Sequence, residues 1–230
     1  MVKNINSFPD PIIPYTFEGV YPPSDDTYLI IDYFKKEVNE NFFDGLPINA
    51  VKKILDMGTG TGIIALLFQE IKKYNSKFTS EIYASDISDV AIRCAMLNER
   101  SNNYIDDITF IKSDLFKKFP PHLQHSFDIV VFNPPYLPSI SYKENNIIRR
   151  PSDSNWDGGA RGFEIFLEFL RQVKDFLNSD QKYYIYYISS SSTDLSQLNE
   201  ELEILGFQNC VLNKRHVFFE DILLNRLEEL

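Results

Sequence analysis

The sequence predicts an α/β fold with a mostly parallel β-sheet that is covered by helices on both faces. Strand-like and helix-like segments alternate along most of the 230 residues, which is typical of parallel strands joined by crossover helices. A glycine-rich stretch, "GTGTG", joins the first of these strands to the helix after it. The last two strand-like segments, 208–219 and 221–229, have no helix between them, so they are expected to form an antiparallel hairpin at one edge.

The individual elements follow from the residue patterns in chain order. A first helix begins at Ser24 or Asp25, either of which can cap it. Its apolar side consists of Tyr28, Leu29, Ile31 and Phe34. Apolar and β-branched residues predict strands at 51–58, 81–88, 108–116, 127–136 and 182–190. Apolar residues at helical spacing predict helices at 62–73, 89–102, 162–178 and 194–206.

Composition narrows the class of protein. Lysine and arginine number 23 against 33 acidic residues, and the resulting net charge of −10 disfavours a protein dedicated to binding duplex DNA. The two cysteines, Cys94 and Cys210, are not paired by their spacing, so we expect reduced thiols in a cytoplasmic protein. The N-terminus lacks a secretory signal pattern, and no apolar run approaches the ~20 residues of a membrane helix.

Acidic residues lie at the ends of three of the predicted parallel strands. Asp56 lies just before the glycine stretch, whose glycines allow a sharp turn and a close approach to a ligand. Asp86 ends the second strand and Asp114 ends the third. Each aspartate alone is more simply explained as a turn or cap residue. Because the carboxyl ends of parallel strands meet at one edge of the sheet, the three together favour a nucleoside-bearing cofactor.

A stiff turn follows the strand-like "FDIVV". The stretch "FNPPYLP", Phe132 to Pro138, contains prolines that cannot donate a backbone hydrogen bond and that fix their own φ angles. The turn therefore displays one amide side chain, Asn133, and one aromatic ring, Tyr136, in a fixed relation. This arrangement is suited to holding a small planar group.

The order of these motifs resembles the class I S-adenosylmethionine-dependent methyltransferases. Members with [N/D]-P-P-[Y/F] act on planar nitrogens, such as exocyclic amines of bases or the side-chain amide of glutamine. Two further stretches, "YPPSDDTYLIIDYF" and "NWDGGARGFEIFLEFL", resemble the HemK/PrmC-related protein-glutamine methyltransferases of archaea and eukaryotes. The resemblance runs from Tyr21 to about Phe169.

This resemblance implies a seven-stranded, mostly parallel Rossmann-like methyltransferase sheet with the C-terminal antiparallel hairpin. Residues 1–230 would form one domain, with 1–50 as an N-terminal extension and helix over the cofactor site. The bacterial relatives carry an extra N-terminal helical domain. S-adenosylmethionine would be the cofactor, with no metal. Its binding residues would be Asp26, Thr27, Asp56, Gly58, Thr59, Gly60, Asp86, Ile87, Asp114, Leu115 and Asn133.

The resemblance also implies the chemistry. The substrate would be a class 1 translation release factor, methylated on the side-chain nitrogen of the glutamine in its Gly-Gly-Gln loop. The catalytic residues would be Asn133, Pro134, Pro135 and Tyr136. Oxygens of Asn133 and Pro134 would accept hydrogen bonds from the substrate NH₂, while Tyr136 would form a flat wall. No general base stands out, since the three histidines, His122, His125 and His216, lack a partner pattern.

Several alternatives stay open. A nucleic-acid adenine-N6 or guanine-N2 methyltransferase would share the mechanism, although the charge and the absence of a Lys/Arg-rich tract disfavour it. A second alternative is a cofactor- or partner-binding subunit without catalysis. For Trp156 and Arg161, packing and a role in a substrate loop are equally plausible, and the sequence does not decide whether the 139–159 loop closes over substrate.

A partner protein is expected as well. Relatives often need a small zinc-binding activator subunit. The strand at 108–116 would lie at an edge of the sheet in this fold, and an unpaired edge with apolar side chains invites the addition of a strand. We therefore expect such a subunit to pair with this strand and form a heterodimer.

Overall fold

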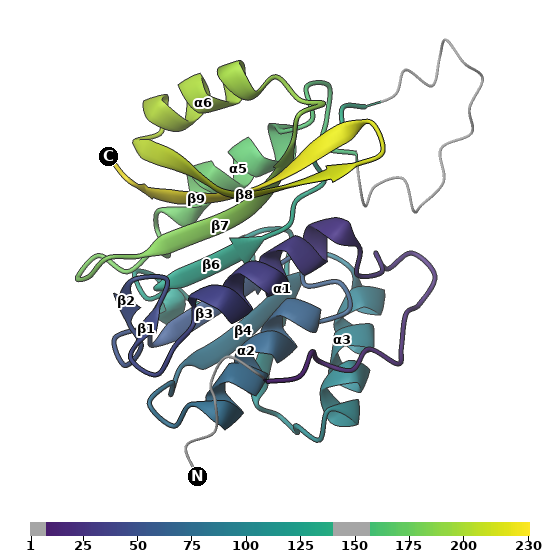
Figure 1. Ribbon diagram of the computed structural model, residues 1–230, viewed down its shortest axis with the longest axis vertical. Coiled ribbons are helices and arrows are strands. Elements are labelled where there is room, and N and C mark those ends of the chain that lie inside the picture. Colours follow the sequence, from purple (N-terminus) through teal and green to yellow (C-terminus); the bar gives the residue numbers. More distant parts are fainter. Residues whose placement is uncertain (1–7, 140–156) are drawn as a thin grey trace.

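The computed structural model describes residues 8–139 and 157–230 of the chain (Figure 1). Seven strands form one sheet in the order β5-β4-β3-β6-β7-β9-β8. The first five of these run parallel, β9 is antiparallel to β7, and β8 is antiparallel to β9. The predicted parallel sheet and its C-terminal antiparallel hairpin are confirmed.

The elements of the sheet are close to those expected. The strands are β3 (Lys53–Met57), β4 (Glu81–Asp86), β5 (Ile108–Lys112), β6 (Ile129–Phe132), β7 (Tyr184–Ser190), β8 (Phe207–Val217) and β9 (Glu220–Glu229). The helices are α1 (Asp25–Glu37), α2 (Ile63–Tyr74), α3 (Asp89–Ser101), α5 (Glu164–Val173) and α6 (Leu195–Ile204), with a 3₁₀ turn at Pro121–Leu123. None of these helices is long and apolar enough to cross a membrane.

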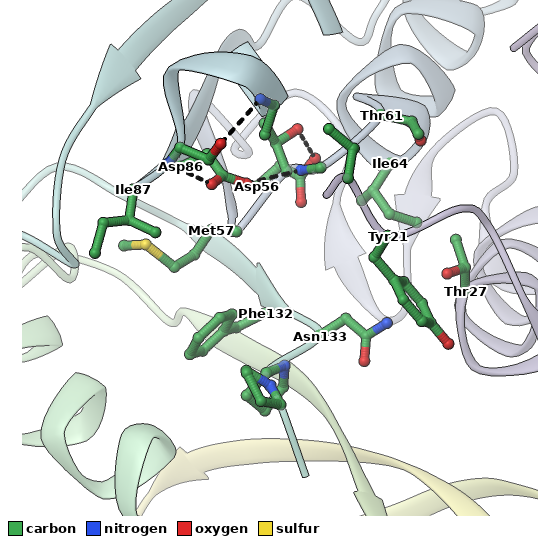
Figure 2. A pocket seen from close by; sticks show the side chains of 18 of the residues that line it. Tyr21, Thr27, Asp56, Met57, Thr61, Ile64, Asp86, Ile87, Phe132 and Asn133 are labelled. Carbon is green, nitrogen blue, oxygen red and sulfur yellow. Dashed lines mark hydrogen bonds between the residues drawn. The ribbon is translucent and has the colours of Figure 1, made fainter. Parts of the chain in front are cut away.

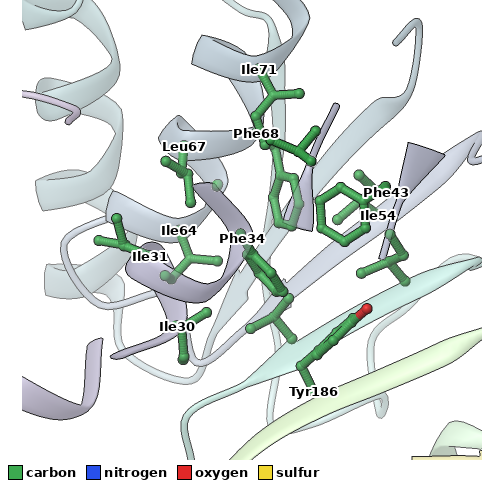
Figure 3. Packing of buried hydrophobic residues seen from close by; sticks show 14 of the residues in the cluster. Ile30, Ile31, Phe34, Phe43, Ile54, Ile64, Leu67, Phe68, Ile71 and Tyr186 are labelled. Atoms are coloured by element: carbon green, nitrogen blue, oxygen red, sulfur yellow. The ribbon is translucent and has the colours of Figure 1, made fainter. Parts of the chain in front are cut away.

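Alternation along the strands produces two apolar layers. Successive side chains of a strand point to opposite faces, so Ile54 and Leu55 belong to different buried clusters. On one face α1 and α2 pack over the sheet, where the ring of Phe34 meets that of Tyr186 edge-on at 4.8 Å (Figure 3). On the other face α5 and α6 supply the contacts, among them Phe166 stacked on Tyr187. A parallel sheet buried on both faces is thereby completed.

Two features differ from the sequence-based expectation. A two-stranded hairpin of β1 (Phe42–Phe43) and β2 (Leu46–Pro47) packs beside α1, and it was not predicted. Its turn residues Asp44 and Gly45 have φ angles of 45° and 82°, the left-handed values that an Asp-Gly hairpin turn requires. The helix predicted to reach residue 178 ends at Val173, because Leu177 leaves it to form a bridge with Phe127.

Candidate active site

One cavity of about 660 Å³ lies at the carboxyl ends of the parallel strands. This is the size and place expected for a ligand site in an open α/β sheet. Every site residue predicted above lines it: Asp26, Thr27, Asp56, Gly58, Thr59, Gly60, Asp86, Ile87, Asp114, Leu115, Asn133, Pro134, Pro135 and Tyr136. Figure 2 shows Asp56 and Asp86 at one end of the cavity and Asn133 with Tyr21 at the other.

The glycine loop is folded around the Asp56 carboxylate. Its Oδ2 accepts hydrogen bonds from Thr59 Oγ1 at 2.6 Å and from Ala65 N at 3.1 Å, which joins the loop to the first turn of α2. Burial raises the pKa of Asp56 to about 7. Gly62 at the start of α2 has a φ of 86°, and a Cβ there would lie 2.9 Å from Ala95 Cβ. Glycine therefore lets α2 and α3 approach closely beneath the loop.

Asp86 closes the same end of the cavity. Its Oδ2 accepts from Gly60 N at 3.0 Å and its Oδ1 from Ser88 N at 2.8 Å. Burial raises the pKa of this carboxyl, and the backbone hydrogen bonds from Ser88 and Gly60 oppose that rise. An ionised carboxylate has about four acceptor positions, so Asp86 can still accept a hydrogen bond from a ligand hydroxyl.

The rim beyond β5 is more open. Asp114 accepts a hydrogen bond from Lys117 Nζ at 2.6 Å and is only partly buried. The next residue, Leu115, is buried and has a φ of 47°, a left-handed conformation that is uncommon for a branched side chain. Such backbone conformations persist where the surrounding structure enforces them, often beside a ligand site.

The prolyl corner, Asn133 to Tyr136, forms the opposite end. Asn133 follows β6 directly, and its Oδ1 atom is buried. Among the described residues this oxygen accepts no hydrogen bond. Most buried polar atoms in native proteins have a partner, so an exception needs an explanation. A substrate N–H group would provide one.

The hydroxyl of Tyr136 is fixed by α1. Asp26 Oδ2 accepts hydrogen bonds from Tyr136 at 3.2 Å and from Tyr21 at 3.1 Å. Asp26 Oδ1 accepts from Thr27 N at 2.6 Å, and the side chain is 1% exposed. Burial and then the negative charge of Asp26 raise the pKa of Tyr136, so its hydroxyl stays protonated and donates. Asp26 and Thr27 thus lie beside the prolyl corner.

Gly158 and Gly162 pack against the backbone of the prolyl corner and support it. Gly158 N donates to Leu137 O at 2.8 Å and Ser139 N donates to Gly159 O at 2.7 Å. A Cβ on Gly158 would lie 2.6 Å from Pro135 O, and one on Gly162 would lie 2.7 Å from Tyr136 O. Only residues without a Cβ permit these backbones to meet, so the "GGARG" segment holds the corner in place.

Arg161, one of the two residues with open roles, is engaged within this segment. Its Nε donates to Glu164 Oε1 at 2.9 Å, and its guanidinium lies 4.6 Å from the centre of the Phe163 ring. Packing therefore accounts for the side chain. Trp156 lies outside the described residues, and so does the 139–159 loop from residue 140 to residue 156.

An N-terminal extension was expected over the cofactor site, but sequence reasoning missed the contacts that hold its N-terminal strap, residues 8–20, which leads into the cavity wall at 18–21. Asn98 of α3 and Asn102, which caps the carboxyl end of that helix, hold it. Asn98 Nδ2 donates to Tyr15 O at 3.0 Å and to Thr61 O at 2.9 Å, while its Oδ1 accepts from Tyr15 N at 3.0 Å. Asn102 makes the same pair of bonds with Ile12, at 2.7 and 2.8 Å. The strap and the glycine loop are thus joined through α3.

The three histidines lie away from the cavity lining. His216 Nδ1 lies 2.9 Å from Asp221 Oδ1 on the C-terminal hairpin. Among the described residues, no group of three or more histidine, cysteine or acidic side chains is placed to hold a metal ion. Because no described histidine lines the cavity, a proton released there would pass to another side chain or to solvent.

Comparisons with known proteins agree with this geometry. A methyltransferase domain family model matches residues 48–221. A putative protein N5-glutamine methyltransferase of Methanocaldococcus jannaschii is 28% identical, with 89% of each chain covered. The eRF1 methyltransferase catalytic subunit mtq2 of Schizosaccharomyces pombe is 25% identical, with 86% of this chain and 83% of that protein covered. A release factor glutamine methyltransferase of Flavobacterium psychrophilum is 33% identical, but only 41% of its length is covered.

Solved structures show the same fold. The E. cuniculi Mtq2–Trm112 complex, described as methylating the eRF1 termination factor, contains a chain that matches with a TM-score of 0.58 at 23% identity, covering 92% of this chain and 99% of that one. A methyltransferase from Pyrococcus furiosus matches with a TM-score of 0.57 at 18% identity, covering 89% and 84%. The expected Rossmann-like methyltransferase fold is confirmed, and the chain belongs to the methyltransferase domain family.

Proposed function

We propose that this protein transfers a methyl group from S-adenosylmethionine to the side-chain amide nitrogen of a glutamine in a class 1 translation release factor. The observation that carries the proposal is the buried Oδ1 of Asn133 at the end of the cavity, which accepts no hydrogen bond from the part of the chain that the structure describes. Two relatives support it, one named a putative protein N5-glutamine methyltransferase and the other an eRF1 methyltransferase subunit, because each aligns with this chain over most of both lengths. The confirmed methyltransferase domain supports the cofactor.

The aspartate end of the cavity fits this cofactor. The Asp86 carboxylate can still accept a hydrogen bond from a ribose hydroxyl, and Asp114 at the rim can accept from the adenine amino group. Left-handed glycines in the loop bring the backbone against the middle of the ligand. When bound, S-adenosylmethionine supplies an electrophilic methyl group on a positively charged sulfur.

The prolyl corner orients the substrate. An amide nitrogen is a weak nucleophile because its lone pair is delocalised into the carbonyl. Asn133 Oδ1 and the Pro134 carbonyl accept the two N–H hydrogens and direct the nitrogen towards the methyl group. Such alignment can lower a barrier by several kcal/mol, about 7–11 at most. As the N–CH₃ bond forms, the S–CH₃ bond breaks, and the nitrogen loses one proton, which passes to solvent.

The ring of Tyr136 confines the planar amide. Its hydroxyl donates to Asp26, which also accepts from Tyr21, so neither ring can move away without breaking a partly buried hydrogen bond. As far as the N-terminal extension is described, it forms one wall of the cavity, and we propose that residues 1–50 cover the cofactor within a single catalytic domain 1–230. Since translation termination is cytoplasmic, we propose this compartment.

A small partner subunit forms the second part of the proposal. β5 pairs only with β4 among the described strands, which leaves its other edge available for an added strand. Phe110 and Ile111 are only partly buried, and Ile105 just before the strand is exposed. The Mtq2 chain with this fold was solved in complex with Trm112. In this proposal a small zinc-binding subunit pairs with β5 and activates the enzyme.

Mass spectrometry tests the methyl transfer. A purified eRF1-type release factor is incubated with the enzyme and S-adenosylmethionine, and its tryptic Gly-Gly-Gln peptide should gain one methyl group on the glutamine. Parallel reactions on DNA and RNA with radiolabelled cofactor should stay at background. Label in nucleic acid and none in the protein would refute the proposed substrate. Addition of a Trm112-type subunit should slow amide exchange in β5, and unchanged exchange would refute the pairing.

A further inference from the structure

Two phenylalanines at the tip of the β8–β9 hairpin are exposed without a structural reason. Phe218 and Phe219 connect Val217 to Glu220, and their exposed fractions are 87% and 101%. Two-residue hairpin turns favour asparagine, aspartate and glycine, which adopt left-handed backbone angles readily. Phe218 has a φ of 52°, which is unusual for a bulky residue. Neither turn chemistry nor burial in the core explains this pair.

The hairpin tip is attached to elements that line the active site. Arg215 of β8 donates to Asp32 Oδ2 at 2.8 Å and to Asp25 Oδ1 at 3.3 Å, at the start of the helix that carries Asp26. Figure 1 shows this end of the hairpin on the same side of the molecule as the amino end of α1. The tip is therefore held near the prolyl corner from the α1 side.

The loop after β7 holds the tip from the other side. Glu220 Oε2 accepts hydrogen bonds from the hydroxyls of Ser190 and Ser192, and Ser191 N donates to Asp221 O at 2.9 Å. Burial, then Asp26 and Tyr21, raise the pKa of Tyr136 most, and the negative charge of Glu220 raises it further. Glu220 therefore lies close to the prolyl corner. Phe218 and Phe219 themselves do not line the cavity. They lie on the surface, in the turn between Arg215, which contacts α1, and Glu220, which contacts the segment after β7.

We infer that Phe218 and Phe219 form a docking point for the folded protein that carries the target glutamine. This inference rests on the proposed function. A cavity of about 660 Å³ that holds both the cofactor and one glutamine side chain leaves the rest of a protein substrate outside, against the surface around the entrance. Exposed aromatic rings that enter an apolar pocket of a partner are typical anchors of such interfaces.

The charges around the tip favour a protein over a membrane surface. Membrane-binding segments combine apolar tips with an excess of lysine and arginine. Here Glu220 and Asp221 follow directly, Lys214 is paired with Asp221 at 3.1 Å, and the chain carries a net charge of −10. Arg215 is already paired with two aspartates of α1. The tip therefore offers aromatic area without free positive charge.

A double variant separates docking from catalysis. Phe218→Ser combined with Phe219→Ser is compared with the wild type on an eRF1-type release factor and on a short synthetic Gly-Gly-Gln peptide that fills only the cavity. We expect KM for the release factor to rise about tenfold or more, as loss of two buried rings would cause, with kcat within about twofold. KM for the peptide and for the cofactor should stay at wild-type values. The control is Ile204→Ser, because Ile204 is 79% exposed at the end of α6 and should change nothing.

The other outcomes are distinguishable. Equal losses of activity on the release factor and on the peptide would show that the tip shapes the cavity. No loss of activity on either substrate would show that the tip has no role in binding. Both outcomes overturn the docking inference and leave the proposed methyl transfer intact. If the wild type methylates neither substrate even with a Trm112-type subunit present, the proposed function fails. Wild-type dimerisation or binding to anionic vesicles that the double variant loses would reassign the tip and also overturn the inference. Circular-dichroism melting of the double variant should match the wild type.

Discussion

The two ends of the cavity differ in whether their buried polar side chains are hydrogen-bonded within the described protein. At the cofactor end, the carboxylates of Asp56 and Asp86 each accept two hydrogen bonds from the glycine loop and from neighbouring backbone groups. At the prolyl corner, Asn133 Oδ1 is buried and accepts none from the described residues. Figure 2 shows the two ends facing each other across the cavity.

This difference matches what each end has to hold. At the cofactor end the hydrogen bonds are already formed within the protein, so the site is rigid. A rigid site reduces the entropy lost on binding. A buried oxygen without a hydrogen-bond partner destabilises the free protein, and in the proposed function a substrate N–H would offset that loss on binding. Changes at the corner should therefore impair turnover, whereas changes at the cofactor end should impair cofactor affinity or stability.

The largest effect should come from removing the unpaired oxygen. Asn133→Ala is expected to lower kcat by about 100- to 1000-fold, the range seen when one pre-positioned hydrogen-bonding group is lost from an active site. Cofactor affinity, measured by calorimetry, should stay within about threefold because the aspartate end is untouched. Turnover within a few-fold of wild type would remove the distinction between the two ends.

Displacing the whole corner should have the next largest effect. In Gly162→Ala the new Cβ would lie 2.7 Å from Tyr136 O and 2.6 Å from Thr193 Cγ2, so the corner must move. We expect kcat to fall by about tenfold to 100-fold and the free energy of unfolding to fall by about 1–3 kcal/mol. Peptide assays and urea denaturation measure the two quantities.

Gly45→Ala is the matched control for that variant. Gly45 has a φ of 82° against 86° for Gly162, but a Cβ there meets nothing within 4 Å. It carries the same backbone penalty without the clash, so activity should remain at the wild-type level. Equal losses of activity in the two variants would mean that backbone strain, and not support of the corner, explains the result.

A smaller effect is expected at the cofactor end. Asp86→Asn removes one acceptor pair and the negative charge, so the cofactor Kd should rise about tenfold, or about 1.4 kcal/mol. At saturating cofactor, kcat should stay close to wild type because the corner still orients the amide. Equilibrium dialysis and peptide kinetics give the two values. A drop in kcat with an unchanged Kd would assign Asp86 to turnover and contradict the division.

The last effect concerns the pH dependence of stability rather than activity. Burial raises the pKa of Asp56 to about 7, above its ordinary value of 3.8, so the folded state binds a proton that the unfolded state has released. Its contribution to stability is present below pH 3.8 and is lost as pH rises to 7. Between about pH 5 and pH 7, urea denaturation should show stability falling by about 1–2 kcal/mol more for wild type than for Asp56→Asn. Parallel pH profiles for the two proteins would mean that Asp56 does not take up this proton.

Much of the fold could be predicted because local pattern and topology agree. β3, β4 and β6 are short apolar runs separated by helices, which leaves few arrangements other than a parallel sheet. The hairpin of β1 and β2 was missed although Asp44-Gly45 is a strong turn signal, because its strands are only two residues long. The site residues at strand ends were brought together by the same topology.

The remaining features depend on contacts that no local pattern records. Asn98 and Asn102 lie 83 and 90 residues from Tyr15 and Ile12, so their hold on the N-terminal strap could not be read from spacing. Tyr21 was noticed as part of a motif, but its hydrogen bond to Asp26 beside Tyr136 appears only in three dimensions. The steric need for glycine at 158 and 162 likewise arises in part from Pro135 and Tyr136, which lie more than 20 residues away in the sequence.

Single-turnover kinetics on the Gly-Gly-Gln peptide with Asn133→Asp and Asn133→Ala test the central claim most directly. Aspartate keeps an oxygen at the corner and loses the NH₂, whereas alanine loses both. If the oxygen orients the substrate nitrogen, the aspartate variant should methylate at least about tenfold faster than the alanine variant, the value of one retained hydrogen bond to a charged acceptor. Equal rates for the two variants would contradict the account.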